Sequence, residues 1–227
     1  MVSPQRKGGQ LKPIAHIETP FKDKFGVPRQ AGLVDYEARV VFEPEFCVHE
    51  AVRGLEEFDY LWLVWLFHLA ERDRWTPTVR PPRLGGNKRV GVFATRSPFR
   101  PNPIGLSSVR LLRVEPGPVL LVSGADLVDG TPILDIKPYI RYADSHPDAR
   151  SGFAAEVPAT LEVIIPDAIV SRLPQPLVGL LRDTIAQDPR PHYHHNPDRI
   201  YTLRLDRFEV RFRVDGSTAF VLGELKN

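Results

Sequence analysis

The segment that most restricts how this chain can fold is residues 96–103, RSPFRPNP, which places three prolines within six residues. Each proline fixes its own φ angle and disfavours helical geometry in the residue before it. Directly upstream, residues 90–95 alternate with the two-residue period of a strand. We therefore expect a strand that ends in a stiff loop displaying Arg96, Arg100 and Asn102. Such a loop binds a ligand without much further loss of conformational entropy, although a structural turn with solvated arginines explains the same residues.

Short alternating segments separated by turn residues occupy much of the chain as far as residue 156. Strands are expected at 13–18, 34–42, 61–68, 104–114 and 119–125. Residues 61–68 are apolar on both faces, which predicts a central strand covered on both sides, with a helix as the competing interpretation. The 23 prolines favour many turns, and the chain contains no G-x-G-x-x-G fingerprint of a Rossmann fold. The pattern predicts a mainly β fold: an antiparallel β-barrel over 13–156, preceded by a flexible N-terminus at 1–12.

Residues 157–227 follow a different pattern. A strand is expected near 160–165, and leucines recur at helical spacing over 177–185. A hairpin with strands at 204–214 and 219–225 then turns at Asp215-Gly216. These elements predict a small α+β domain.

Composition narrows the possible partners and compartments. The single Cys47 excludes an intramolecular disulfide and a cysteine-based zinc site, which suits a reducing compartment. The longest apolar run, 60–70, is too short to span a membrane, and we see no signal peptide. We therefore expect a cytoplasmic protein with no membrane partner. The net charge of +2 is small, so any contact with nucleic acid must come from local clusters of arginine.

Several motifs together resemble one known family. They are KFGVPRQAGL at 24–33, LWLVWLFH at 61–68, VRPPRLGGN at 79–87, GVFATRSPFRPNPIGLSSV at 91–109, DLVDGTPILDIKPYI at 126–140 and AQDPRPHY at 186–193. With them the chain resembles the TsaA-like (TrmO-type) family, which consists of S-adenosylmethionine-dependent tRNA methyltransferases. Members methylate N6 of a threonylcarbamoyl-adenosine next to the anticodon. The resemblance runs from about residue 14 to residue 142 and resumes at the last motif.

The resemblance implies S-adenosylmethionine as cofactor, tRNA as substrate and a homodimer with cofactor sites near the subunit boundary. The cofactor-binding residues that it implies are Pro28, Arg29, Gln30, His68, Arg96, Leu106, Asp129, Gly130, Thr131 and Pro132. Without the family, Arg29-Gln30 is a solvated loop pair and His68 a histidine of the core or its rim. The apolar stretch 61–67, together with Trp75, offers a surface for the second subunit.

Methylation of an exocyclic amine requires a hydrogen-bond acceptor that orients the N–H group so that the nitrogen lone pair points towards the methyl group. Asn102, Asp135 and the backbone carbonyls of Pro101 and Pro103 are the candidates for this role. Arg96 suits a carboxylate of the cofactor or of the substrate, because a guanidinium group does not give up its proton.

Basic residues on loops and on one strand face are the candidates for RNA contact, because guanidinium groups pair with phosphate oxygens. They are Arg80, Arg83, Arg100, Arg190, Arg211 and Arg213. Over residues 207–214 apolar and mainly basic residues alternate, so one face packs and the other is basic. A solvated strand face explains this alternation equally well.

Two alternatives to a methyltransferase remain at this point. His192, His194 and His195 near Asp188 and Asp198 suggest a metal-dependent hydrolase, although such a cluster in a proline-rich loop is more often solvated or faces RNA, so we expect no metal. The other alternative is a noncatalytic RNA-binding module that uses the arginine loops alone.

Overall fold

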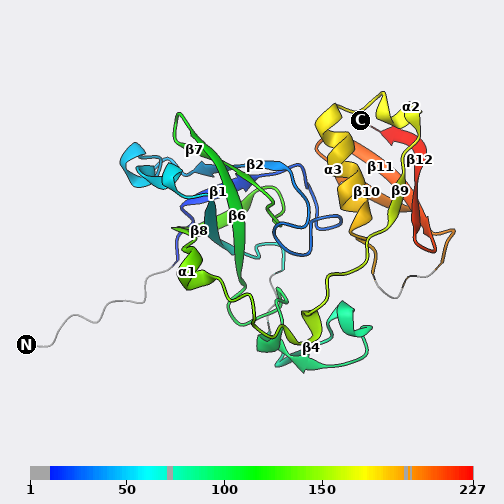
Figure 1. The fold of residues 1–227 in the computed structure, drawn as a ribbon, viewed down its shortest axis with the longest axis horizontal. Helices are drawn as coiled ribbons and strands as arrows, with labels where there is room; N and C mark the ends of the chain where they lie inside the picture. Colours follow the sequence, from blue (N-terminus) through cyan, green and yellow to red (C-terminus); the bar gives the residue numbers. More distant parts are fainter. Residues whose placement is uncertain (1–10, 71–73, 192–193, 195, 227) are drawn as a thin grey trace, which may run out of the picture.

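The computed structural model describes residues 11–70, 74–191, 194 and 196–226. Antiparallel strands close into a barrel in the order β1-β2-β7-β6-β3-β8 (Figure 1). The strands are β1 (Ala15–Glu18), β2 (Glu37–Phe42), β3 (Tyr60–Leu66), β6 (Ile104–Glu115), β7 (Val119–Ser123) and β8 (Thr131–Pro138). This confirms the predicted antiparallel β-barrel. Segments with period-two alternation form its strands, because such segments bury one face inside the barrel and expose the other.

The prediction that both faces of residues 61–68 are covered is met only in part, because Trp62, Val64 and Leu66 on the outer wall are half-buried. Leu61, Leu63 and Trp65 point into the barrel core and are 0%, 0% and 7% exposed, whereas Tyr60 and Trp62 lie on the outer wall, where Tyr60 is 46% exposed. Strand β3 is central only in that it pairs with β6 on one side and β8 on the other. A closed barrel gives each strand one inner and one outer face, so the apolar outer residues of this strand cover no core of their own.

The strand expected over 90–95 is also largely absent. Only β5 (Val90–Gly91) is extended, pairing with β4 (Thr78–Val79), and the 3₁₀ turn η4 (Val92–Ala94) follows. The Thr95 hydroxyl donates to the Val92 carbonyl over 2.8 Å and the Thr95 N–H donates to the same carbonyl over 3.1 Å. A threonine side chain that bonds to nearby backbone competes with the strand pattern and closes the turn.

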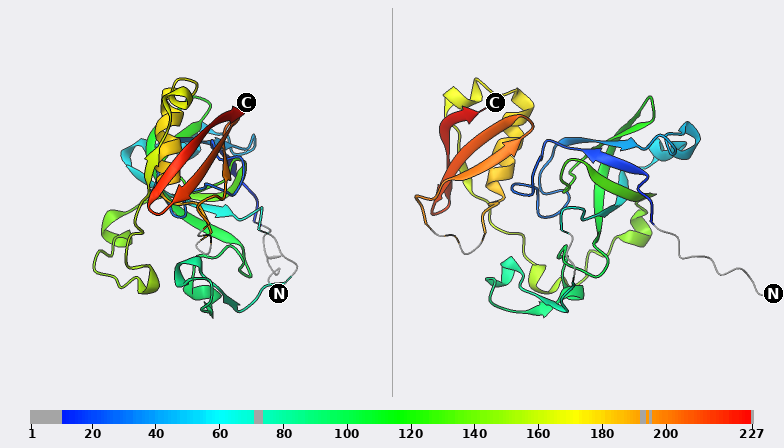
Figure 2. Two further views of the ribbon diagram at one scale, coloured as in Figure 1. Left: turned by 90° about the vertical axis from the view of Figure 1, so that its right-hand side faces the viewer. Right: turned by 180° about the vertical axis from the view of Figure 1, so that it is seen from behind.

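The C-terminal part is a small α+β unit, as predicted. Its sheet has the order β10-β11-β12-β9, and β12 and β9 are parallel. The elements are β9 (Glu162–Ile164), α2 (Asp167–Val170), α3 (Gln175–Ala186), β10 (Tyr201–Leu205), β11 (Phe208–Asp215) and β12 (Thr218–Lys226). Helix α3 packs through Leu181 and Ile185, both 0% exposed, and lies along the sheet (Figures 1 and 2). The segment expected as one strand over 204–214 is two strands, because Asp206 adopts φ 51° and turns the chain.

Short elements complete the described fold. They are η1 (His49–Val52), η2 (Leu55–Glu57), η3 (Pro82–Leu84), α1 (Arg141–Asp144) and η5 (Gly152–Ala154). Within the described ranges no helix is both long and apolar enough to cross a membrane.

The loop between β1 and β2 joins the barrel to the C-terminal sheet. The Asp206 N–H donates to the Pro20 carbonyl over 2.7 Å, and the ring of Phe25 stacks on that of Tyr201 with 6.2 Å between centroids. Gly26, at φ 95°, lies so close to the sheet that an added Cβ would stand 2.1 Å from Cδ1 of Leu203. This loop therefore makes contacts that a larger residue at position 26 would disrupt.

Candidate cofactor and catalytic site

Strand polarity brings most of the predicted cofactor residues to one rim of the barrel. The end of β1 pairs with the start of β8, the start of β2 with the end of β7, and the end of β3 with the start of β6. Antiparallel neighbours therefore place the loops 19–36, 67–103 and 124–130 at the same end. Pro28, Arg29, Gln30, His68, Arg96, Asp129 and Gly130 all lie on these loops, while Thr131, Pro132 and Leu106 begin the adjoining strands.

Side chains and backbone groups tie these loops together. The Arg96 guanidinium donates to the side-chain carbonyl of Gln30, and the Gly32 N–H donates to the Gly124 carbonyl over 2.8 Å. Arg96 is exposed, and in the described part of the chain no carboxylate lies within ion-pair distance of it. Its remaining donors are available to an anionic group that enters at the rim.

Asp126 is the functional candidate that the sequence interpretation missed. It follows the apolar strand β7 and accepts a hydrogen bond from the hydroxyl of Ser107, which faces inward from β6 and is 2% exposed. The indole N–H of Trp65 donates to the same hydroxyl over 2.9 Å. An added Cβ on Gly105 would stand 2.3 Å from Cε2 of Trp65, so only glycine allows this indole to lie where it does. The signal available in the sequence was an acidic residue directly after the strand expected over 119–125.

The electrostatics around Asp126 are unusual for a carboxylate. Burial raises the pKa of Asp126, and this outweighs the hydrogen bonds from Ser107 and from backbone N–H groups, and the positive charge of Arg96, which all lower it. The pKa of Tyr36 is raised by burial and by the negative charge of Asp126. Within the described residues, the buried Tyr36 hydroxyl has no hydrogen-bond partner. A carboxyl group more basic than usual therefore lies near an unsatisfied buried phenol.

The proline-rich loop is held by its own side chains. Arg100 donates to the carbonyl oxygens of Thr95 and Ser97 over 2.9 and 3.3 Å. The Thr95 hydroxyl accepts from the Ser97 N–H, and the Ser97 hydroxyl accepts from the Phe99 N–H. Arg100 was predicted to contact RNA, but its Nη1 stabilises the loop by donating to these two carbonyl oxygens.

Arg29 and Gln30 are adjacent but bind different partners. The Arg29 guanidinium donates to the carbonyls of Asp188 and Arg190 over 2.8 and 3.0 Å. Burial lowers the pKa of Arg29, the charge of Asp188 raises it and the charge of Arg83 lowers it. Arg190, predicted to contact RNA, forms a two-pronged ion pair with Asp188 at 2.7 and 2.9 Å. Arg29 therefore connects the rim to the segment that follows α3.

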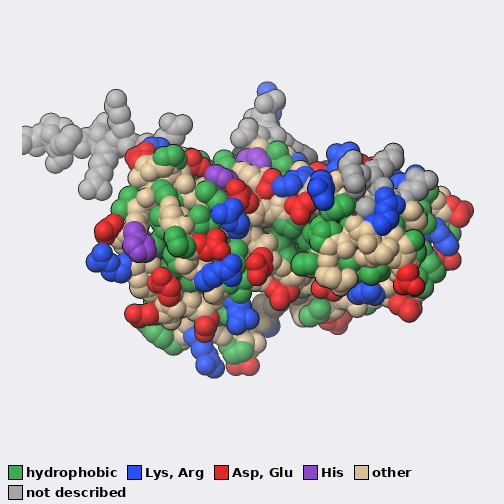
Figure 3. All heavy atoms as spheres, turned by 90° about the horizontal axis from the view of Figure 1, so that it is seen from above, with side chains coloured by type: hydrophobic (Ala, Val, Ile, Leu, Met, Phe, Trp, Pro, Cys, Tyr) green, Lys and Arg blue, Asp and Glu red, His purple; other side chains and the backbone are tan. Residues whose placement is uncertain are grey.

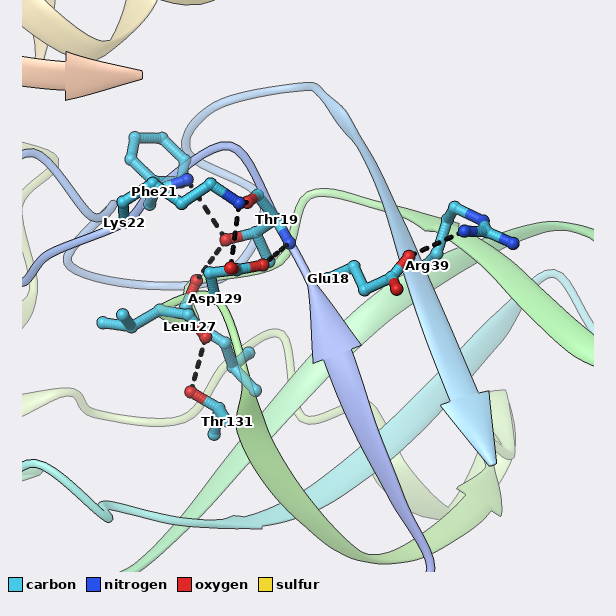
Figure 4. A network of polar contacts seen from close by, with 9 residues as sticks. Glu18, Thr19, Phe21, Lys22, Arg39, Leu127, Asp129 and Thr131 are labelled. Carbon is cyan, nitrogen blue, oxygen red and sulfur yellow. Dashed lines mark hydrogen bonds and ion pairs between the residues drawn. The ribbon is translucent and has the colours of Figure 1, made fainter. Parts of the chain in front are cut away.

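Asp129 has a clear structural role (Figure 4). Its carboxylate accepts from the Thr19 N–H and from the Lys22 ammonium group, both over 2.8 Å. The backbone N–H of Asp129 donates to the Phe21 carbonyl over 2.9 Å, and the Thr131 hydroxyl donates to the Val128 carbonyl over 2.6 Å. The turn at 129–131 is thus fixed to the loop after β1, and both carboxylate oxygens already have donors.

The remaining candidates of the barrel lie on its outer wall or in exposed loops. Leu106 on β6 and Asp135 on β8 flank Val64 of β3, and Leu106 is 56% exposed. Asp135 forms an ion pair with Lys137 over 2.8 Å. Asn102 is exposed between two prolines, and its carbonyl accepts from the Ile104 N–H over 2.7 Å. His68 is half-buried and lies two residues after the end of β3.

Besides Arg100 and Arg190, the predicted RNA-contacting residues lie in two places, near η3 and on β11. Arg80 and Arg83 are exposed near η3, where Arg83 donates to the Glu156 carbonyl over 3.2 Å. Arg211 and Arg213 share the outward face of β11, whose Phe208, Val210, Phe212 and Val214 are buried as predicted. Of the proposed metal ligands, His192 and His195 lie outside the described residues. Among those described, no group of three or more His, Cys, Asp or Glu could hold a metal ion.

Comparison with known proteins gives the family. The TrmO N-terminal domain (tRNA-methyltransferase O) matches residues 16–145, and the TrmO C-terminal domain matches 158–226. A tRNA (adenine(37)-N6)-methyltransferase of Escherichia coli K12 is 45% identical over 219 residues, which are 90% of this chain and 93% of the relative. One from Eikenella corrodens is 50% identical over 72% of this chain and 95% of its own.

A putative S-adenosylmethionine-dependent methyltransferase of Pseudomonas aeruginosa, RcsF, is 45% identical over 89% of this chain and 91% of its own. The crystal structure of TrmO from P. aeruginosa superposes with a TM-score of 0.80 at 37% identity, covering 99% of this chain and all of that one. The solved structure agrees with the mainly β fold described here. The chain belongs to the TrmO family of tRNA methyltransferases.

Proposed function

We propose that this methyltransferase uses S-adenosylmethionine to methylate N6 of a threonylcarbamoyl-adenosine at position 37 of tRNA, in the cytoplasm. The observation that supports this most is the rim, where exposed Arg96 meets Gln30 close to the partly buried Asp126. A threonylcarbamoyl group carries a carboxylate, and so does the methionine part of the cofactor. An exposed guanidinium with unused donors suits either carboxylate.

The rim residues fit S-adenosylmethionine in charge and polarity. Arg96 matches its carboxylate, and the negative charge of Asp126 matches its cationic sulfonium. Leu106, exposed on the outer wall next to the rim, matches a purine ring that lies at the subunit boundary. The backbone around Gly130 and the loop 28–30 complete the set that the family resemblance implies. When bound, the cofactor supplies an electrophilic methyl group. The residues of the chain then have to orient the amine and to accept its proton.

Asp126 is the acceptor that the geometry favours. Transfer of a methyl group to N6 forms a C–N bond, breaks the S–C bond and releases one proton from the nitrogen. A carboxylate whose pKa is raised by burial is a stronger base than an exposed one. Asp135 forms an ion pair with Lys137 on the outer wall, and Asn102 offers an amide oxygen that orients but does not hold a proton. We therefore assign proton acceptance to Asp126, with Asn102 and Asp135 as further candidates for orienting the amine.

Mass spectrometry of nucleosides from bulk tRNA tests the substrate. Cells with the protein should contain the methylated threonylcarbamoyl-adenosine, and cells without it should not. Purified enzyme acting equally on tRNA with unmodified adenine at position 37 would contradict the requirement for threonylcarbamoyl. An Asp126→Asn variant should lose most of kcat while its KM for tRNA stays near that of wild type; an unchanged kcat would remove Asp126 from the chemistry.

Isothermal calorimetry tests the cofactor site. One S-adenosylmethionine should bind per chain, and Arg96→Ala should weaken binding by about 1.5 to 3 kcal/mol, the contribution of a hydrogen bond to a charged group. Arg53→Ala is a matched control, because its side chain is 78% exposed beside η1, away from the rim. Equal affinities of wild type and Arg96→Ala would place the cofactor elsewhere.

We also propose that the enzyme is a homodimer through the outer wall of β3, β6 and β8. Tyr60 and Leu106 are 46% and 56% exposed there, and Trp62 and Val64 lie between them. Leu61, Leu63 and Trp65, by contrast, belong to the barrel core and are not available. Light scattering should give a dimer mass, and Val64→Glu should give a monomer. A monomer mass for the wild type at micromolar concentration would contradict the proposal.

Contact with tRNA is assigned to the Arg80–Arg83 segment and to the outward face of β11. Each phosphate contact contributes about 0.7 to the salt dependence of binding in single-stranded regions. Replacement of Arg211 and Arg213 by Glu should raise KM for tRNA and flatten its salt dependence while S-adenosylmethionine affinity is kept. Wild-type kinetics across a salt series would leave β11 without a role in RNA binding.

A further inference from the structure

Residues 74–95 form a small projection beside the barrel, which we call the arm. It contains the β4–β5 hairpin and the 3₁₀ turns η3 and η4. In the ribbon views the arm extends below both the barrel and the C-terminal sheet (Figures 1 and 2). The proline-rich loop of the rim continues directly from it, so the arm lies next in the chain to Arg96.

The arm exposes two large aromatic rings. Phe93 is 71% exposed and Trp75 is 50% exposed, and their ring centroids lie 6.2 Å apart at an angle of 30°. The exposure of Phe93 follows from the turn η4: Val92 is 1% exposed, and its N–H donates to the Pro77 carbonyl over 2.9 Å. This anchoring of Val92 directs the next side chain outward. Two neighbouring aromatic rings that remain exposed to solvent are typical of a binding surface.

The charge of the arm is of one sign. The sequence contains no Asp or Glu from Arg74 to Val114. The cations of the arm are Arg74, Arg80, Arg83, Lys88 and Arg89, all exposed. In the described part of the chain none of them has a carboxylate within ion-pair distance, whereas Lys22, Arg39 and Arg190 elsewhere do. On the face seen in Figure 3, by contrast, acidic and basic side chains are interspersed.

We propose that the arm binds the single-stranded anticodon loop of the tRNA substrate, with a base stacked on the Phe93–Trp75 pair and the arm cations on flanking phosphates. Unstacked loop bases commonly stack on aromatic side chains, and cations beside the rings hold the backbone. Position 37 lies in that loop, so a platform next to the rim would hold a nucleotide near the target base. The inference rests on tRNA being the substrate.

A second copy of the chain is a poorer occupant of the arm. In a twofold dimer the same patch meets itself, which would bring the cations of one arm against those of the other. Like charges at an interface are unfavourable, whereas the phosphates of an RNA loop neutralise them. Charge complementarity therefore selects RNA as the occupant.

The test is the affinity for an anticodon stem-loop RNA, measured by fluorescence anisotropy with wild type, Phe93→Ala, Phe93→Trp and Tyr142→Ala. Phe93→Ala should weaken binding by about 5- to 150-fold, the range for loss of one base–aromatic stack. Phe93→Trp should bind like wild type, because it keeps an aromatic face. Tyr142 is 93% exposed in α1 and serves as the matched control, whose loss should leave the affinity unchanged.

Two results would overturn the platform. One is a Phe93→Ala variant that binds the stem-loop with wild-type affinity and methylates tRNA with wild-type KM. The other is a fall in mass of that variant in light scattering, which would assign the ring to a subunit contact. A wild-type protein that does not bind the stem-loop would instead refute the proposed action on tRNA, so the two failures are distinguishable.

Discussion

Replacing Ser107 by alanine should destabilise the fold strongly, although it removes a single oxygen atom. The Ser107 hydroxyl accepts from the indole N–H of Trp65 and donates to Asp126, and the residue is 2% exposed. A buried N–H left without a partner costs about 1 to 3 kcal/mol, and a lost hydrogen bond to a charged group costs about 1.5 to 3 kcal/mol. Because both terms share one hydroxyl and relaxation recovers part of them, we expect a loss of about 3 to 5 kcal/mol at neutral pH.

The loss of stability caused by Ser107→Ala should depend on pH, because the Ser107 hydroxyl bonds to the ionisable carboxyl group of Asp126. Burial raises the pKa of Asp126 in the folded state, so this carboxyl favours folding below its unfolded pKa, and that contribution is lost as pH rises through the folded pKa. The bond from Ser107 favours the ionised form and opposes this loss. Its removal therefore costs most above the folded pKa and less where the carboxyl is protonated. Asp126 also interacts electrostatically with Tyr36 and Arg96, and both residues are unchanged in the Ser107→Ala variant.

Urea unfolding from about pH 4 to about pH 8 measures this difference. Ser108→Ala is the matched control, because Ser108 is the next residue of β6, lies opposite Trp62 on the outer wall and is half-buried. It should change the free energy of unfolding by less than about 0.5 kcal/mol. In an Asp126→Asn background the pH dependence of the Ser107→Ala effect should vanish. The role assigned to the Ser107 hydroxyl would be refuted if Ser107→Ala lowered the free energy of unfolding no more than Ser108→Ala does, or by the same amount at every pH.

Two glycines give further predictions. Gly105→Ala places a Cβ 2.3 Å from the Trp65 ring, so it should lower the free energy of unfolding by about 1 to 3 kcal/mol, and near-ultraviolet circular dichroism should report the displaced indole. Gly26→Ala combines φ 95° with a Cβ 2.1 Å from Leu203, so it should loosen the loop on the C-terminal sheet; limited proteolysis should then cut the chain between the two parts faster than in wild type, and an equal rate would contradict this contact.

The barrel could be predicted from the sequence because its strands are specified locally. Alternation over 104–114 and 119–125 coincides with β6 (Ile104–Glu115) and β7 (Val119–Ser123). The failures occurred where a particular bond overrides the pattern. The Thr95 hydroxyl closes a turn in an alternating segment. Asp206 breaks the expected long strand because its N–H donates to Pro20, far away in the chain, while its backbone takes a positive φ. Neither hydrogen bond can be recognised from the alternation of apolar and polar residues around it in the sequence.

The site was predictable only in part, for a related reason. Loop motifs identified Arg96 and Gln30, and the structure brings these two side chains into contact. Asp126 was missed because the burial that raises its pKa arises only in the folded barrel and has no counterpart in the neighbouring sequence. Arg100 was assigned to RNA from its residue type, whereas its bonds to backbone carbonyls follow from the fold of its own loop.

The loop between β1 and β2 is where the two parts of the molecule and the rim are joined. Its first residues hold the 129–131 turn through Asp129, and its middle packs Phe25 on Tyr201. Its last residues divide: Arg29 bonds to the segment after α3, while Gln30 bonds to Arg96. Because Arg29 and Gln30 are consecutive, the contact with the segment after α3 and the contact with Arg96 lie on adjacent residues of one loop. The segment after α3 is thus connected to the rim through one loop, by the carbonyls of Asp188 and Arg190 on one side and the side chain of Arg96 on the other.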